Sequence, residues 1–303
     1  MTLDTQMTSR SLWRERVSSY TRRIKDFWTI YKKSRMGMVG VSLVLGFIII
    51  AFVAPWLAPY HPRALVGTPF LPPTNEHLLG TDQVGRDIYS ELLWGTRVSL
   101  MVGLLASAFA VAIGTAIGLL SGYYRGLLDS VLMRITDLFI TLPVLPFILI
   151  LAALLGRNIG NIIVVIAITG WTGTARMVRS QTLSIKERPY VEAARSIGAR
   201  DSHVMIRHIL PNVFPLVFAN AIIGIVDAIL AESGLSFLGL GDPSQPSWGM
   251  ILHYANEAGA LATGRWWFII PPGICIMLVT IGFAFSSYSL DQILNPRLRK
   301  RRW

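Results

Sequence analysis

The sequence predicts an all-α integral membrane protein with six transmembrane helices and both termini in the cytoplasm. Composition is the first reason, since 52% of the 303 residues are hydrophobic and only 15% are charged, against about 25% charged in a soluble domain. The single cysteine, Cys275, excludes an internal disulfide and a thiolate metal cluster. The other two reasons are long apolar stretches and the uneven placement of the basic residues that flank them.

Six stretches are long enough to cross a bilayer, which takes about 20 mainly apolar residues in a helix. Core helices of soluble proteins are shorter, about 11–12 residues on average, so a soluble bundle is disfavoured. The first stretch follows a long basic tail and exceeds a signal-peptide core in length, so we expect it to be retained as an anchor. The predicted spans are about 36–58, 98–120, 136–156, 159–177, 211–235 and 267–289.

The orientation follows from the Lys and Arg residues of the connecting segments, which accumulate on the cytoplasmic side of membrane proteins. With the N-terminus inside, the cytoplasmic segments are 1–37, 121–135, 176–211 and 291–303, and they hold 23 of the 28 basic residues. The net charge of +11 therefore reports topology and contact with anionic lipid. A nucleic-acid partner is disfavoured because the charges are dispersed and no such motif is present. We expect a multi-pass protein of the cell (inner) membrane, with a basic cytoplasmic tail 1–35 and a basic C-terminus 291–303.

Two predicted external segments and one helix stripe have distinctive sequences. Segment 59–97 is rich in proline, which predicts extended or turn-like backbone, and segment 240–265 contains an apolar cluster from Trp248 to Leu252 that we expect to dip back towards the membrane. The second span carries small residues at every fourth position, which predicts close approach of another helix. They are Ala106, Ala110, Gly114, Gly118 and Gly122.

The chain lacks the motifs of the common catalytic and cofactor sites. It has no Gly-x4-Gly-Lys-Ser/Thr phosphate-binding loop, no His-Glu-x2-His and no Gly-x-Ser-x-Gly. Its five histidines are scattered along the sequence, which disfavours a metal site. We therefore expect no enzymatic activity and no cofactor in this chain.

The loop 176–211 predicts a helix–turn–helix outside the bilayer. Pro189 suits the first position of a helix, Gly198 suits a left-handed end, and Asp201 or Ser202 suits the N-cap of a second helix that ends near Ile209. The first helix would present Tyr190, Ala194 and Ile197 on one apolar face, and the second Val204, Met205 and Ile209. Arg195, Arg200 and Arg207 would form a basic rim. Such a face packs on the membrane surface or docks in a groove of a cytoplasmic protein.

Here the residues resemble a known family. Glu192-Ala193-Ala194-x3-Gly198-x11-Leu210-Pro211 is similar to the EAA loop of ABC importer permeases, although His208 stands where the general signature has isoleucine. The block from His77 to Asp87 resembles the segment ahead of the second span in the C-type permease subunit of dipeptide, oligopeptide and nickel importers. Leu235–Gly241 followed by Ser247-Trp248-Gly249 also looks like that subfamily.

The resemblance implies the type I ABC importer permease fold, with a coupling loop over 186–211 that seats on an ATPase. The implied partners are a second related permease, two ATPase subunits that bind ATP and Mg, and an extracytoplasmic substrate-binding protein. The implied substrate is a di- or oligopeptide, with nickel chelates and oligosaccharides still open. The coupling residues would be Tyr190, Glu192, Ala193, Ala194, Arg195, Gly198, Ala199, Leu210 and Pro211, and the family motif ahead of the second span is Gly80, Thr81, Asp82, Gly85, Arg86 and Asp87.

Two carboxylates fall in or near the fifth span, Asp227 and Glu232. An ionisable group at membrane depth is a functional hypothesis by default. Asp227 would line the pore and meet a cationic group, or would form an ion pair or hydrogen bond within the bundle, and Glu232 would lie nearer the outer interface. An ion-coupled secondary transporter that uses one of these carboxylates is the alternative function, although the absence of an inverted repeat disfavours it.

Overall fold

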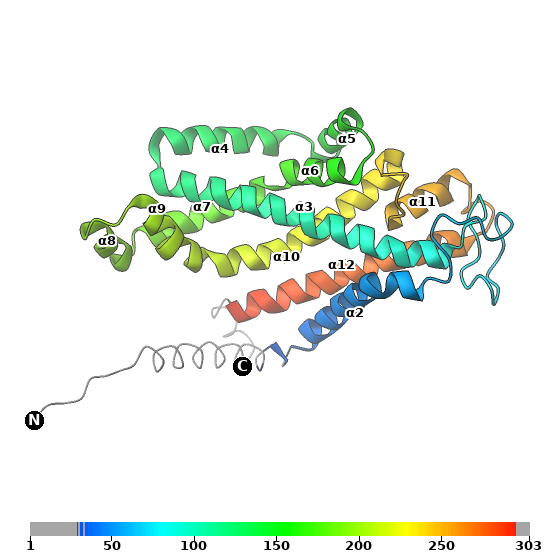
Figure 1. The fold of residues 1–303 in the computed structure, drawn as a ribbon. Helices are drawn as coiled ribbons and strands as arrows, with labels where there is room; N and C mark the ends of the chain where they lie inside the picture. Colours follow the sequence, from blue (N-terminus) through cyan, green and yellow to red (C-terminus); the bar gives the residue numbers. More distant parts are fainter. Residues whose placement is uncertain (1–28, 30, 33, 295–303) are drawn as a thin grey trace, which may run out of the picture.

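The computed structural model describes residues 29, 31, 32 and 34–294, and within them it is a bundle of helices with no strand (Figure 1). The predicted tails 1–35 and 291–303 therefore fall mostly outside the described residues. The helices are α2 (Arg35–Leu57), α3 (Ile88–Tyr124), α4 (Gly126–Thr141), α5 (Val144–Leu155), α6 (Ile159–Gly170), α7 (Thr172–Lys186), α8 (Pro189–Ser196), α9 (Asp201–Val204), α10 (Leu210–Leu235), α11 (Trp248–Glu257) and α12 (Trp266–Leu294), with π-helical turns at Met205–Ile209 and Ser236–Leu240.

The long apolar helices agree with the membrane prediction in number. Four are long enough to cross a bilayer singly: α2, α3, the continuous helix Asp201–Leu240, and α12. Two more spans are possible if the bent pairs α4–α5 and α6–α7 each count as one. The first and last described segments meet, because the Ser34 and Ser289 hydroxyls are 2.8 Å apart.

Three helices run beyond the predicted spans or bend within them, for local physical reasons. The helix that contains the predicted second span, 98–120, already begins at Ile88, because the Asp87 carboxylate caps it by accepting from the Ser90 amide at 2.8 Å. The third stretch, 136–156, is not one straight helix, since α4 and α5 meet at 94° at Pro143, which lacks an amide hydrogen and restricts the residue before it. The fourth is longer than expected and bends by 42° where α6 gives way to α7.

The predicted stripe of small residues lies where α3 packs against α7. A Cβ atom on Gly114 would lie 2.5 Å from the Trp171 carbonyl, and one on Gly118 would lie 2.5 Å from the Ala175 carbonyl. Gly122 makes the same approach to α7, with the Thr182 Cβ at 2.7 Å. The prediction of close helix approach is confirmed, and the reason is that only hydrogen fits between these backbones.

The second predicted external segment packs on protein. α11 begins after Ser247, whose hydroxyl caps the Met250 amide at 3.2 Å. Trp248 is fully buried, donates from Nε1 to the Leu92 carbonyl at 3.2 Å and meets Phe47 edge-to-face at 5.6 Å. The apolar cluster that suggested a dip towards the membrane therefore joins α11 to α2 and α3 in the protein core.

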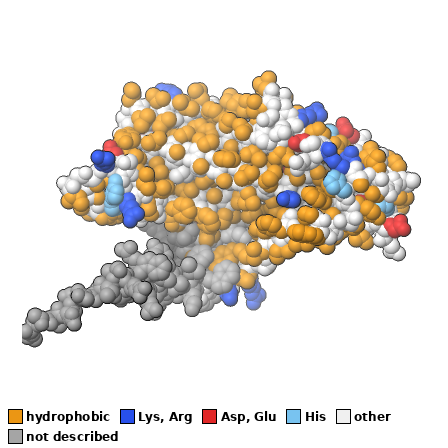
Figure 2. Space-filling view, in the orientation of Figure 1, with side chains coloured by type: hydrophobic (Ala, Val, Ile, Leu, Met, Phe, Trp, Pro, Cys, Tyr) orange, Lys and Arg blue, Asp and Glu red, His pale blue; other side chains and the backbone are white. Residues whose placement is uncertain are grey.

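The surface of the bundle is apolar along most of its length. Figure 2 shows hydrophobic side chains over most of the visible face, while most charged side chains lie near its two ends. Large side chains such as Phe52, Trp56 and Leu127 are exposed. A surface of this kind suits the acyl chains of a bilayer, with the charged ends at the headgroups.

Candidate functional site

The helix α8 forms as its sequence predicts. Pro189 is its first residue, and it ends in a Schellman arrangement, because the Gly198 amide donates to the Arg195 carbonyl at 2.9 Å and the Ala199 amide to the Ala194 carbonyl at 3.1 Å. Gly198 adopts φ +88°, a left-handed conformation that glycine reaches without strain. The EAA sequence is thus a single short helix with a glycine stop.

The buried face of α8 differs from the predicted one. Val191 and Ala194 are buried, and Val191 packs in a cluster with Val178, Val204 and others. Tyr190 is 41% exposed and Ile197 is 87% exposed. The structure therefore divides the apolar residues between two faces. Val191, which the sequence reading left out, anchors the helix. The coupling patch is defined here as the exposed apolar side chains of the loop, Tyr190, Ile197 and Ile206.

The second helix of the loop is not a separate unit. Arg200 is the N-cap residue, so Asp201 is the first helical residue and not the cap as predicted. The helix then passes through the π-helical turn Met205–Ile209 directly into α10, where Leu210 and Pro211 are the first two residues. His208, at the position of the signature isoleucine, packs its ring 6.5 Å from Tyr190 and 5.6 Å from His203.

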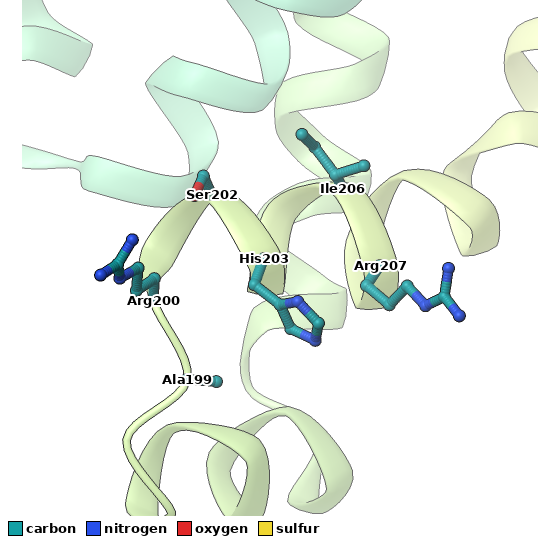
Figure 3. Close-up of a pocket in the computed structure, with 6 residues that line it drawn as sticks. All are labelled: Ala199, Arg200, Ser202, His203, Ile206 and Arg207. Atoms are coloured by element: carbon teal, nitrogen blue, oxygen red, sulfur yellow. The ribbon is translucent and has the colours of Figure 1, made fainter.

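A basic groove of 490 Å³ shares Ile206 with the coupling patch. It is lined by Ala199, Arg200, Ser202, His203, Ile206 and Arg207. Figure 3 shows the Arg200 and Arg207 side chains extending away from each other on either side of His203. Glu192 and Ala193 of the EAA sequence are also exposed. The loop thus presents an apolar and predominantly basic surface that the described chain itself leaves uncovered.

Asp227 and Glu232 lie in different surroundings. Asp227 is exposed and lines a cavity of 540 Å³ together with Ser107, Thr174 and Asn220. Glu232 is 2% exposed and accepts hydrogen bonds from the hydroxyls of Ser99 at 3.3 Å and Ser236 at 2.7 Å. Glu232 is therefore held by hydroxyls in the interior of the bundle, and its predicted position near the outer interface stays a prediction. Glu232 is not among the residues that line the cavity of Asp227.

The motif ahead of α3 forms a tight loop that starts this helix. Asp82 Oδ1 accepts from the amides of Val84 at 2.9 Å and Arg86 at 2.7 Å, and burial raises the pKa of this carboxyl above its ordinary value. Gly80 and Gly85 have positive φ angles of 69° and 90°, which explains the glycines.

The remaining motif residues bind the loop to itself. The Thr81 hydroxyl donates to the Thr68 carbonyl at 2.7 Å, and Asp87 Oδ1 lies 3.0 Å from His77 Nδ1. Arg86 lies 3.6 Å from Glu91, a buried carboxylate in the first turn of α3 that the sequence reading missed. These contacts give the motif a structural role at the end of the bundle opposite α8 and α9 (Figure 1).

Tyr123 is a second residue that the sequence reading missed. It is buried at the end of α3, whereas the next residue, Tyr124, is exposed. The sequence around these two adjacent tyrosines does not indicate which one is buried. Their tertiary contacts decide it. Among the described residues, no group of three or more His, Cys, Asp or Glu is placed to hold a metal ion.

Two family descriptions and several known permeases match this chain. Residues 114–300 match the family described as binding-protein-dependent transport system inner membrane component, and residues 23–75 match the N-terminal transmembrane domain of oligopeptide transport permease C. The dipeptide transport system permease protein DppC of Bacillus subtilis is 36% identical over 93% of this chain and 87% of its own length. The glutathione transport system permease protein GsiD of Pectobacterium atrosepticum is 36% identical over 91% of each chain.

A solved amino acid ABC transporter aligns with 70% of this chain and 94% of its own, at a TM-score of 0.47 and 18% identity. The resemblance that was drawn from the EAA loop, from the block His77–Asp87 and from the block Leu235–Gly249 is confirmed. It is confirmed by the family match and by relatives that share about a third of their residues with this chain over nearly its full length. The chain therefore belongs to the family of binding-protein-dependent transport system inner membrane components, and it is a multi-pass inner-membrane permease of an ABC importer.

Proposed function

We propose that this chain forms half of the pore of a peptide importer and receives the energy of ATP hydrolysis through α8 and α9. The main observation behind this proposal is that the loop has two kinds of apolar side chain. Val191 and Val204 are buried and anchor the loop to the bundle, whereas the side chains of the coupling patch are exposed. An exposed apolar patch rimmed by charge is typical of a protein-binding surface. Relatives named for dipeptide and glutathione transport support a peptide as the substrate.

The implied partners are two ATPase subunits, a second related permease and a substrate-binding protein. The ATPases supply the nucleotide and Mg²⁺ sites, and this chain performs no chemistry of its own. The α8–α9 end of the bundle then lies in the cytoplasm, with both termini, as the basic residues predict. An apolar helix face of this kind docks in a groove of its partner, so Tyr190, Glu192, Ala193 and Ile197 would contact an ATPase.

Mechanical continuity supports this assignment. Asp201–Leu240 is one helix, so its first turn lies beside α8 and its later turns carry Asp227 to the wall of the 540 Å³ cavity. A movement of the loop driven by the ATPases would therefore tilt the segment that lines the cavity. Coupling of this kind between distant sites needs two arrangements of a rigid element, not chemistry in the membrane.

We place Asp227 on the substrate path. Among the described residues no cation lies within ion-pair distance of its carboxylate, and the cavity also offers hydroxyl and amide groups from Ser107, Thr174 and Asn220. A carboxylate at membrane depth requires a partner, and the amino terminus of a peptide supplies a positive charge.

The first experiment is purification of the tagged chain in mild detergent with identification of the co-eluting proteins by mass spectrometry. The expected result is two ATPases, or one ATPase twice, with a second six-span permease. The purified assembly is then reconstituted, and peptide uptake is measured with vanadate or with an uncoupler. Inhibition by vanadate alone supports the proposal. Uptake that only the uncoupler abolishes, by a chain that elutes alone, would replace it with an ion-coupled secondary transporter.

A further inference from the structure

Tyr123 occupies the junction of four segments. It is the penultimate residue of α3, where side chains usually reach solvent, yet it is 2% exposed while Tyr124 is 47% exposed. Its ring lies in the cluster that also contains Val178 of α7 and Val191 of α8. The burial of this aromatic ring is thus shared between the long helices and the coupling loop.

The polar contacts of Tyr123 reach every neighbouring segment. Its hydroxyl donates to Asp201 Oδ1 of α9 at 2.6 Å. The Arg195 guanidinium of α8 lies 4.8 Å from the ring centroid, and the Lys186 ammonium of α7 lies 5.1 Å from it. Lys186 also donates to the Tyr123 carbonyl. A hydrogen bond to a carboxylate and two cation–π contacts are directional and strong for their size.

Directional contacts matter here because the packing of α8 and α9 on the bundle is largely apolar. A further directional contact of the loop, the ion pair between Glu187 and Arg125, is exposed to solvent. Val191 and Val204 hold α8 and α9 to the bundle by apolar burial, which depends on area and little on orientation. Apolar surfaces of this kind can slide. The hydroxyl of Tyr123 and the charges around its ring supply directional contacts between the loop and the ends of α3 and α7.

Both of these helices line the cavity of Asp227. Ser107 and Ala110 come from α3, and Thr172 and Thr174 come from α7. The two helices are in backbone contact along Gly114 and Gly118, which disfavours movement of one helix without the other. A displacement of α8 that reaches Tyr123 therefore reaches two walls of the cavity.

We propose that Tyr123 is a positioning residue, the joint through which the coupling loop moves α3 and α7. The inference rests on the proposed function, because it assumes that ATPases drive the loop. Its role is to transmit movement, so its loss should lower the number of peptides imported per ATP hydrolysed. It should leave the assembly of the complex and the ability of the ATPases to hydrolyse ATP intact.

The test uses the full complex with its ATPases, second permease and binding protein, reconstituted in liposomes. Tyr123→Phe removes only the hydroxyl, and Tyr124→Phe removes the same atom from the exposed neighbour as a matched control. We expect Tyr123→Phe to lower the ratio of peptide imported to ATP hydrolysed below the wild-type value, and Tyr124→Phe to leave it unchanged. Asp201→Ala, which removes the acceptor of the Tyr123 hydroxyl, should have a similar effect, and the double variant Tyr123→Phe/Asp201→Ala should be no worse than either single variant.

Three outcomes are distinguishable. Equal ratios for wild type and Tyr123→Phe would overturn the joint while the proposed function stands. A Tyr123→Phe complex with reduced yield, and with import and hydrolysis reduced in proportion, would show a merely structural residue and would also overturn it. If the wild-type complex shows no ATP-dependent peptide import, the proposed function fails and the joint fails with it.

Discussion

Replacement of Gly118 by alanine tests the packing of α3 on α7. The added Cβ atom would lie 2.5 Å from the Ala175 carbonyl oxygen, 2.7 Å from the Val178 Cβ and 2.9 Å from the Arg179 amide. Two of these three atoms belong to the backbone, so rotation of a side chain cannot relieve the contact. The helices must separate by about 1 Å to restore ordinary van der Waals distances of about 3.5–4.0 Å.

The expected cost follows from the effects of overpacking and of helix propensity. Overpacking costs about 1–3 kcal/mol, and the upper end applies because backbone atoms are the obstacle. Alanine regains about 1 kcal/mol over glycine inside a helix. The Gly118→Ala protein should therefore lose about 2 kcal/mol of stability, or roughly 4–8 °C in melting temperature.

The assay is thermal unfolding of the purified protein in one detergent, with Gly46→Ala as the matched control. Gly46 lies inside α2, and a Cβ atom there would meet nothing within 4 Å, so the control should melt at or above the wild-type temperature. A Gly118→Ala protein that melts with the control would refute the argument that α3 and α7 are in backbone contact.

Three further changes test the other sites. Gly198→Ala places a side chain at φ +88°, which costs about 1–2 kcal/mol and should lower peptide import per ATP hydrolysed; a wild-type ratio would mean that the end of α8 does not affect coupling. Asp227→Asn keeps the shape but removes the charge and should raise the KM for peptide uptake, whereas unchanged uptake affinity and rate would remove Asp227 from the substrate path. The folded-state pKa of the Asp82 carboxyl is raised. The stability that its neutral form contributes is therefore present in acid and is lost as the pH rises through that pKa. Asp82→Asn should flatten the pH dependence of the melting temperature, and curves that run parallel for the variant and the wild type would contradict this.

The sequence predicts the features of this protein that a single stretch of residues determines. Span number, orientation and the small-residue stripe follow from hydropathy, from Lys and Arg placement and from a spacing of four, and the packing of the stripe is confirmed at Gly114 and Gly118. The start of α8 at Pro189 and its left-handed stop at Gly198 are confirmed as well. Each of these signals is read within one segment, because the proline ring and the glycine hydrogen act on their own backbone.

Only the tertiary structure decided which side chains meet. The helical period predicted one apolar face for α8 with Tyr190, Ala194 and Ile197, whereas packing in the tertiary structure buries Val191 and leaves Tyr190 exposed. Tyr123 differs from Tyr124 only in its neighbours Asp201, Arg195 and Lys186. Burial and hydrogen bonding between segments more than 60 residues apart depend on the direction in which each helix enters the bundle, and no local pattern records that direction.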